Sequence, residues 1–338
     1  MQRSEANVMP EPCSKCGILA YCAKNPAVSL IMKTMSNLAR ILDSGHFAVT
    51  AEISPTQNTE LDMIKKNINL IKGYVDAFSV PDGQAAVVAM ASWAVCLVGI
   101  KEGLDAIVHM TCRDQNRIAL QMDILAVSAL GVNNILCLSG DPIHFGNHPK
   151  AKPVFDIDSI QLVRMVKQLR DEKKFDNGEL MVGAEPKLFI GAAINPSAQP
   201  SEATVERLKE KVSAGADFVQ TQPIYNIEGF KKWMQLVREK GLHKQARIIG
   251  GITPITSLAA ARYMKTKLPN MDIPDTIIER LKNVRNREEA AEEGIEIAVE
   301  TINQLKQVEG VAGMHLMTLQ REELVPKICN AAGLYPRP

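Results

Sequence analysis

The chain has 338 residues, 46% hydrophobic and 23% charged, so it is long enough and apolar enough to form one large globular core. Its formal net charge of +1, without any tract of lysines or arginines, argues against a nucleic-acid or membrane-surface partner. No apolar run approaches the ~20 residues that cross a bilayer, and residues 1–12 lack the apolar core of a signal peptide, so we expect a cytoplasmic protein.

Residues 1–30 form an extension rich in cysteine and proline, in which Cys13, Cys16 and Cys22 are spaced as CxxCx₅C. In a cytosolic chain such crowding suggests metal or iron–sulfur ligation more than a disulfide. Three thiolates could hold zinc or part of an iron–sulfur cluster, with His46 or a partner chain as fourth ligand. A disordered or partner-docking tail is the alternative. The cysteines expected to be buried free thiols, because they fall in apolar segments, are Cys96, Cys112, Cys137 and Cys329.

Eight apolar runs with the character of buried strands follow the extension. Most of their centres lie roughly 29 residues apart, a usual length for a β-plus-α unit. The runs are almost wholly apolar rather than alternating, as expected when helices cover a parallel sheet. The predicted strands are residues 48–54, 75–81, 106–112, 134–140, 188–195, 218–222, 246–252 and 311–317.

The segments between these runs have helical spacing of apolar residues, and eight alternations favour a closed barrel over an open sheet. No GxGxxG follows the first strand, which removes the main Rossmann signal. Two connections are long: residues 141–156 after the fourth strand, and a proline-containing stretch with two helices after the seventh. We therefore predict a (β/α)₈ TIM barrel over residues 31–338. The predicted helical faces comprise Leu61, Ile64, Ile68 and Ile71, then Val205, Leu208 and Val212, then Ile295, Ala298, Ile302 and Leu305.

In such a barrel the carboxyl ends of the strands face the active site. Two acids, Glu52 and Asp141, and several amides close otherwise apolar strands here, and no predicted strand carries a lysine within it that could form a Schiff base. This set suits binding and protonating a polar heterocycle, while a cofactor performs the redox chemistry that side chains cannot. The polar residues at predicted strand ends are Glu52, Ser54, Asp82, His109, Arg113, Asp114, Ser139, Gly140, Asp141, Asn195, Gln220, Gln222, Thr253 and Thr318.

At these same strand ends the chain resembles the methylenetetrahydrofolate reductases. The matching pieces occur in the family's order over residues 45–338, and seven in order are far more specific than any one alone. They are AEISPT, HMTCRDQNR, LCLSGDP, GAAINP, LKEKVSAGADFVQTQ, GITP and MHLMTLQREE. The resemblance implies a flavin-dependent enzyme that reduces 5,10-methylenetetrahydrofolate to 5-methyltetrahydrofolate.

The resemblance also implies residue roles. Glu52 is expected to be the general acid that protonates the folate's bridging nitrogen, and Asp141 to stabilise the resulting iminium. Gln222, with Gln220 as its strand neighbour, is expected to bind the pterin, and Arg321 the folate tail. Lys211 would offer its charge to the phosphates of FAD. The residues expected to contact FAD are His109, Ser139, Gly140, Asp141, Asp156, Ile157, Asn195 and Lys211.

Two positions depart from the family pattern: Ser139 replaces a frequent arginine, and Asn195 a frequent aromatic residue. These changes leave FMN open beside FAD, and an electron donor other than NAD(P)H. With the cysteine-rich extension, the arrangement resembles the multi-subunit reductases of anaerobes that use the reductive acetyl-CoA pathway, in which ferredoxin or an iron–sulfur partner subunit delivers electrons. Two alternatives stay open: a pterin-binding barrel subunit of a methyltransferase, and a non-catalytic electron-transfer subunit.

Overall fold

Eight parallel strands close into a barrel in their order along the chain, as the sequence predicts. The fold comes from a computed structural model that describes residues 36–196, 201–268 and 271–338. Closure brings the last strand beside the first, with Thr50 opposite His315. The strands are β1 (Ala48–Glu52), β2 (Ala77–Val80), β3 (Ala106–Thr111), β4 (Asn134–Leu138), β5 (Phe189–Ile194), β6 (Phe218–Pro223), β7 (Arg247–Ile252) and β8 (Val311–Leu316).

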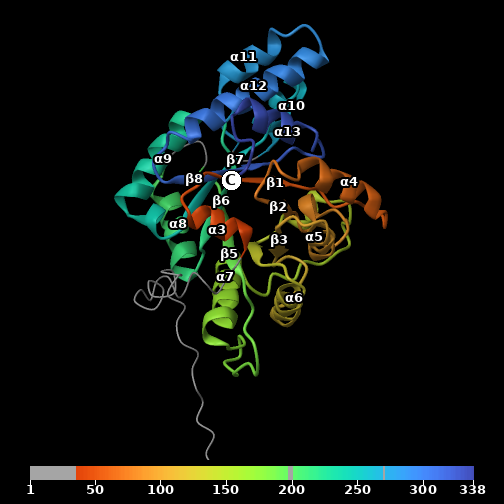
Figure 1. Cartoon of the computed structure of the whole chain (residues 1–338), viewed down its shortest axis with the longest axis vertical. Coiled ribbons are helices and arrows are strands. Elements are labelled where there is room, and N and C mark those ends of the chain that lie inside the picture. The colour runs from red at the N-terminus through yellow and green to blue at the C-terminus, as the bar shows by residue number, and fades with distance from the viewer. Residues whose placement is uncertain (1–35, 197–200, 269–270) are drawn as a thin grey trace, which may run out of the picture.

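Helices surround the barrel and cover its outer face (Figure 1). The predicted faces are confirmed except at Leu61, which is exposed at the start of α4. On that helix Ile64, Ile68 and Ile71 are buried against the strands, because residues three and four apart share one side of a helix. The helices that follow β1 to β6 are α4 (Leu61–Ile71), α5 (Ser92–Lys101), α6 (Arg117–Ala129), α7 (Ser159–Lys167), α8 (Glu202–Ala214) and α9 (Ile227–Glu239).

The connection between β7 and β8 corrects one prediction: it contains α10 (Leu258–Lys267), α11 (Asp275–Lys282) and α12 (Arg287–Leu305), where the sequence suggested two helices. The count falls short by one helix, and α10, with the sequence LAAARYMKTK, has a weak apolar stripe, on which Ala261 and Met264 alone are buried. The three helices share a satellite core with Tyr225 and Ile255. They project from one side of the barrel, at the top of Figure 1.

The amino-terminal end of the barrel is covered by α3 (Asn37–Asp43), a helix that the sequence did not reveal. Leu38 and Ile41 are fully buried and pack against Phe189 and Phe218 in the barrel floor. Figure 1 shows α3 in front of the strands. The chain end, after α13 (Leu324–Ala331), returns to the same side of the barrel. There Arg337 forms a 2.6 Å ion pair with the buried Asp76.

Two further expectations from the sequence concern membrane-spanning helices and the cysteines. Within the described ranges, no helix is both long and apolar enough to cross a membrane. The expectation for the four cysteines in apolar segments is confirmed, because each of them is buried and free. The cysteines of the extension, Cys13, Cys16 and Cys22, lie outside the described residues.

Candidate active site

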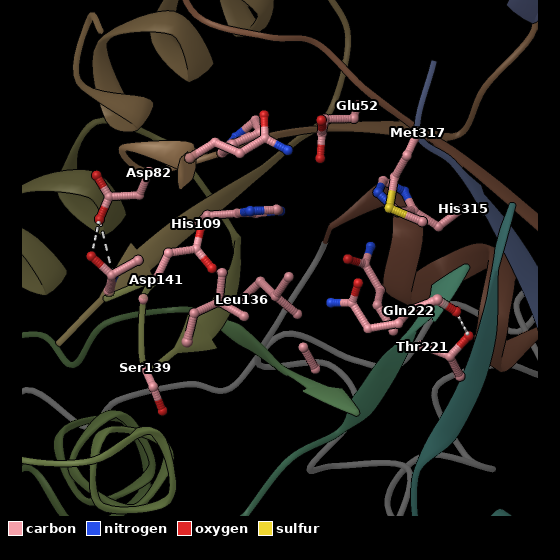
Figure 2. A pocket seen from close by; sticks show the side chains of 17 residues that line it. Glu52, Asp82, His109, Leu136, Ser139, Asp141, Thr221, Gln222, His315 and Met317 are labelled. Carbon is pink, nitrogen blue, oxygen red and sulfur yellow. Dashed lines mark hydrogen bonds between the residues drawn. The ribbon is translucent and has the colours of Figure 1, made fainter. Parts of the chain in front are cut away.

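A pocket of about 320 Å³ opens at the carboxyl ends of the strands, opposite the end that α3 covers. Its lining comes from six strands, β1, β3, β4, β5, β6 and β8, and from loops that follow the strands. Figure 2 shows Glu52, His109 and Gln222 directed toward one space, with Asp141 on the side of Asp82. The lining residues are Glu52, Pro81, Asp82, Gln84, His109, Thr111, Leu136, Leu138, Ser139, Gly140, Asp141, Ala193, Gln220, Thr221, Gln222, His315 and Met317.

Glu52, the last residue of β1, is the pocket's buried acid. Its side chain is 6% exposed, and its Oε1 atom has no hydrogen-bond partner among the described residues. Burial, reinforced by the Glu322 carboxylate, raises the pKa of Glu52 to about 7. Removing a carboxylate from water disfavours its charged form, and a second negative charge acts in the same direction. Glu52 is therefore an acid that can hold or release a proton near neutral pH.

Two neutral histidines lie beside this acid. Burial, with a further contribution from His315, lowers the pKa of His109 to about 3, and burial lowers the pKa of His315 to about 4. The His315 ring lines the pocket and is held in place, its Nδ1 2.9 Å from Thr50 Oγ1 and its Nε2 3.4 Å from Ser79 Oγ. His109 Nε2 has no partner within the described chain. Because both rings are uncharged, neither lowers the pKa of Glu52 by attraction.

Strand β6 supplies two amides. Gln220 is buried, and its Nε2 lacks a hydrogen-bond partner among the described residues, while Gln222 is exposed at the mouth. The β6–β7 register shifts between Gln220 and Pro223, and Thr221 Oγ1 donates to the Gln222 carbonyl at 2.9 Å. Such an irregularity re-aims a side chain at a barrel rim. The two glutamines thus present donors and acceptors to the pocket at different depths.

The wall opposite β6 is built around Arg113, which is almost fully buried. Its guanidinium donates to the carbonyl of Gly83 at 3.0 Å and to that of Asp141 at 3.4 Å, so it ties together the loops after β2, β3 and β4. Gly140 lies close to the base of this side chain: its φ is +90°, and a Cβ there would lie 2.9 Å from Arg113 Cβ. Glycine at 140 is therefore required by both backbone conformation and space.

Asp141 lies at the rim of the pocket, where its carboxylate holds the loop after β2. Its Oδ2 accepts a hydrogen bond from the Ala85 N–H at 2.8 Å. Ala85 and Ala86 both have left-handed φ values, 54° and 55°, which are unfavourable for alanine. Asp82 is engaged likewise, since its Oδ2 accepts from the N–H and the hydroxyl of Thr111. Of these two acids, Asp141 is the exposed one and thus the accessible one.

The structure brings most of the predicted site residues together, but not all. Asp156 lies outside the pocket, paired with Arg117 at 2.9 Å, and Ile157 is buried in the core. Lys211 is buried with its Nζ 3.4 Å from Ser159 Oγ at the start of α7. The predicted residues that do not line the pocket are Asp156, Ile157, Asn195, Lys211 and Arg321. Their predicted contacts with the distal part of the flavin and with the folate tail stay predictions.

Several contributors were not identified from the sequence as site residues. Glu322, four residues beyond Thr318, is buried and affects Glu52 electrostatically. Thr50 and Ser79 orient His315 from inside β1 and β2. In the sequence, each of these two residues is a hydroxyl side chain within an apolar strand. Such a residue is equally typical of a barrel core in which the hydroxyl hydrogen-bonds to the backbone. Within the described residues, no group of three or more histidines, cysteines and acids could hold a metal ion.

A flavin and a folate suit the chemistry of this pocket. Buried polar atoms of Glu52, His109 and Gln220 face it without partners among the described residues, and an orphaned polar group in a protein interior usually has a ligand or water as its partner. The pocket thus combines hydrogen-bonding groups with the apolar surfaces of Leu136 and Met317.

Comparison with known proteins identifies one family. The family model described as methylenetetrahydrofolate reductase matches residues 37–333. Methylenetetrahydrofolate reductase 2 of Schizosaccharomyces pombe is 30% identical over 68% of this chain, and 5,10-methylenetetrahydrofolate reductase of Salmonella typhimurium is 29% identical over 70%. The aligned region spans 36% of the fission-yeast protein and 74% of the bacterial one.

The fold is shared with a solved structure at lower sequence similarity. An uncharacterized protein from Clostridium thermocellum, described as binding two copies of 5-methyl-5,6,7,8-tetrahydrofolic acid, superposes with a TM-score of 0.62. The similarity covers 88% of this chain and 98% of that one at 16% sequence identity. At this identity the likeness concerns the barrel fold alone.

Proposed function

Because the chain belongs to the methylenetetrahydrofolate reductase family, we propose that it reduces 5,10-methylenetetrahydrofolate to 5-methyltetrahydrofolate with the help of a bound flavin. The observation that carries the proposal is Glu52, a buried acid at the carboxyl end of the barrel with a pKa raised to about 7. Its Oε1 atom, which has no partner among the residues that the structure describes, faces a pocket large enough to hold part of two ring systems. The chemistry needs such an acid, because the folate's bridging nitrogen must be protonated before its ring opens.

Glu52 has the properties of a general acid at physiological pH. An ordinary glutamic acid is almost wholly ionised at pH 7, whereas one with a pKa of about 7 is protonated in about half of the molecules. The neutral His109 and His315 leave this proton in place, because neither contributes a positive charge that would favour the carboxylate. The Asp141 carboxylate, on the opposite wall, would stabilise the positive charge that ring opening creates.

Other residues of the pocket would bind and orient. The flavin, when bound, supplies the hydride that no side chain can deliver. His109, Ser139, Gly140 and Asp141 would hold its ring system, with FMN open beside FAD, and Asp156, Ile157, Asn195 and Lys211 the remainder. Gln222 and Gln220 would hydrogen-bond the pterin, whose amide edge needs both donors and acceptors. Arg321 would pair with the carboxylates of the folate tail.

The test separates the two half-reactions of purified protein. We expect the full chain to be yellow, with the absorbance bands of a bound flavin, and Glu52→Gln to keep the flavin. In that variant we expect reduction of the flavin by a donor to be unchanged and its reoxidation by methylenetetrahydrofolate to fall about 10²–10⁴-fold, the usual contribution of a general acid. Near-full reoxidation by folate would remove Glu52 from the mechanism, and a colourless protein would favour a pterin-binding methyltransferase subunit or a non-catalytic one.

The same assay identifies the electron donor. We propose either NAD(P)H or a ferredoxin or iron–sulfur partner as the source of electrons. Comparing the rates of flavin reduction by NADH, NADPH and reduced ferredoxin distinguishes the two sources. Deletion of residues 1–30 tests the cysteine-rich extension: a loss of reduction by ferredoxin, with reduction by an artificial donor retained, assigns electron entry to Cys13, Cys16 and Cys22.

A further inference from the structure

The loop after β8 turns sharply and brings a second acid to a buried position. Leu319 and Gln320 both have left-handed φ values, 52° and 67°, a conformation that is unfavourable for any residue with a side chain. The turn carries Glu322, just before α13, to a place where it is 4% exposed. Two consecutive left-handed residues without a glycine indicate that contacts beyond the turn hold Glu322 in place.

These contacts are with the end of β1. The Glu322 carboxylate accepts hydrogen bonds from the Ser54 N–H and from its own N–H. Ser54 lies two residues beyond Glu52, and the pairing of β8 with β1 continues up to Leu316, which lies opposite Ala51. The loop after β8 therefore sets a second carboxyl group near the acid of the pocket, close enough to act on its pKa.

No positive charge offsets that of Glu322 within the described residues. The neighbouring Arg321 is directed to Glu323, with its Nε 3.1 Å from Oε1, and none of the cationic side chains that the structure describes forms an ion pair with Glu322. Two buried carboxyl groups near each other, without a cation between them, do not both ionise readily. We expect them to hold one proton between them near neutral pH.

The other titratable groups that line the pocket do not compete for this proton. The two histidines are uncharged near neutral pH, and both aspartates accept hydrogen bonds from loop or strand N–H groups. Among the described residues, Glu322 is the charged group that contributes to the pKa of Glu52. The other groups are His109 on β3, His315 on β8, and Asp82 and Asp141 in the loops after β2 and β4.

The surroundings of the two glutamates decide which of them carries the proton. Glu322 accepts two backbone N–H groups, which favour its charged form. Glu52 has an Oε1 atom without a partner among the described residues, and its burial favours the neutral acid. The proton therefore lies on Glu52 and the charge on Glu322. Titratable groups whose surroundings move their pKa values apart in this way are typical of acid–base sites.

We propose, on the basis of the function proposed above, in which Glu52 is the proton donor, that Glu322 is a positioning residue whose fixed negative charge holds that proton on Glu52. Glu322 does not line the pocket, so it acts through Glu52 and not by contact with folate or flavin. Without this charge Glu52 would ionise at lower pH, because the nearby carboxylate would no longer oppose a second negative charge. The reaction would then lose its acid in the alkaline part of its pH range.

The test is the pH dependence of flavin reoxidation by methylenetetrahydrofolate in the full chain. Glu322→Gln removes the charge and keeps an oxygen that can accept the Ser54 N–H. We expect its rate to equal that of the wild type at pH 5 and to be about tenfold lower at pH 8.5, because the profile moves by ~1 pH unit to the acid side. Glu60→Gln, at an exposed carboxyl after the same strand, is the matched control and should keep the wild-type profile. A wild-type profile for Glu322→Gln, or a rate lowered equally at every pH, would overturn the proposal.

Infrared spectroscopy of the same proteins follows the proton without turnover. We expect the C=O band of a protonated carboxyl that titrates near pH 7, disappears in Glu52→Gln, and titrates ~1 pH unit lower in Glu322→Gln. A band of unchanged amplitude in Glu52→Gln would place the proton elsewhere and overturn the proposal, even if Glu322→Gln failed to fold. The infrared shift without any folate reduction would support the carboxyl pair and refute the proposed reduction. Reduction that depends on Glu52 but has an unshifted profile in Glu322→Gln would refute the role of Glu322 alone.

Discussion

Replacing Glu52 by glutamine should change how the stability of the protein depends on pH. The pKa of Glu52 is about 7 in the folded chain and close to 4.5 in the unfolded one. Between these values the folded protein holds a proton that the unfolded chain has released, so stability falls as pH rises, and the loss is complete above pH 7. A difference of this size corresponds to about 3 kcal/mol, at about 1.4 kcal/mol for each pKa unit.

Glutamine has nearly the same shape and carries no charge at any pH, so the variant should escape this loss. We expect the free energy of unfolding of Glu52→Gln, relative to that of the wild type, to rise by about 3 kcal/mol between pH 4.5 and pH 8.5. Urea denaturation of flavin-free protein across this range measures it. Glu60→Gln, at an exposed carboxyl just before α4, is the control and should parallel the wild type.

Two results would contradict this reasoning. Parallel pH profiles for Glu52→Gln and the wild type would mean that Glu52 is as well solvated as an ordinary surface acid. A variant that loses stability relative to the wild type as pH rises would mean that the carboxylate, not the acid, is the stabilised form. Either result would also remove the physical basis for Glu52 as a proton donor near neutral pH.

Three further changes test the framework of the site. Gly140→Ala should destabilise the protein by about 1–2 kcal/mol more than Gly131→Ala in thermal denaturation, because both glycines have φ near +90° but only Gly140 is crowded by side chains. Arg337→Ala should reduce stability toward urea by about 3–5 kcal/mol, because it leaves the buried Asp76 without its ion-pair partner; Asp76→Asn in the same background should recover part of the loss. Leu38→Ala should reduce it by about 2–5 kcal/mol by opening a cavity beneath the barrel. Equal effects of the two glycine changes, or a loss under 1 kcal/mol in either of the others, would refute the corresponding account.

The sequence determined the barrel, because its evidence is local. Each strand is a short apolar run and each flanking helix repeats its apolar residues every three or four positions, so both signals can be recognised within about a dozen residues. The parallel arrangement then follows from the alternation, and it places Glu52, Asp141 and Gln222 at one end before any coordinates are known. A local pattern does not predict a helix where the apolar repeat is weak, as in α10. It also does not predict a short helix such as α3, whose apolar residues have a visible role only once the end of the barrel that they cover has formed.

The tertiary structure alone decided the properties that make this end of the barrel reactive. The raised pKa of Glu52 depends on burial and on Glu322, which is distant in sequence but close in space, because β8 pairs with β1. The neutrality of His109 and His315 likewise follows from their surroundings. The type of residue determines which group can be protonated. Its pKa in the folded protein depends on how far folding removes the group from water and on which charges folding brings near it. No local pattern in the sequence shows either.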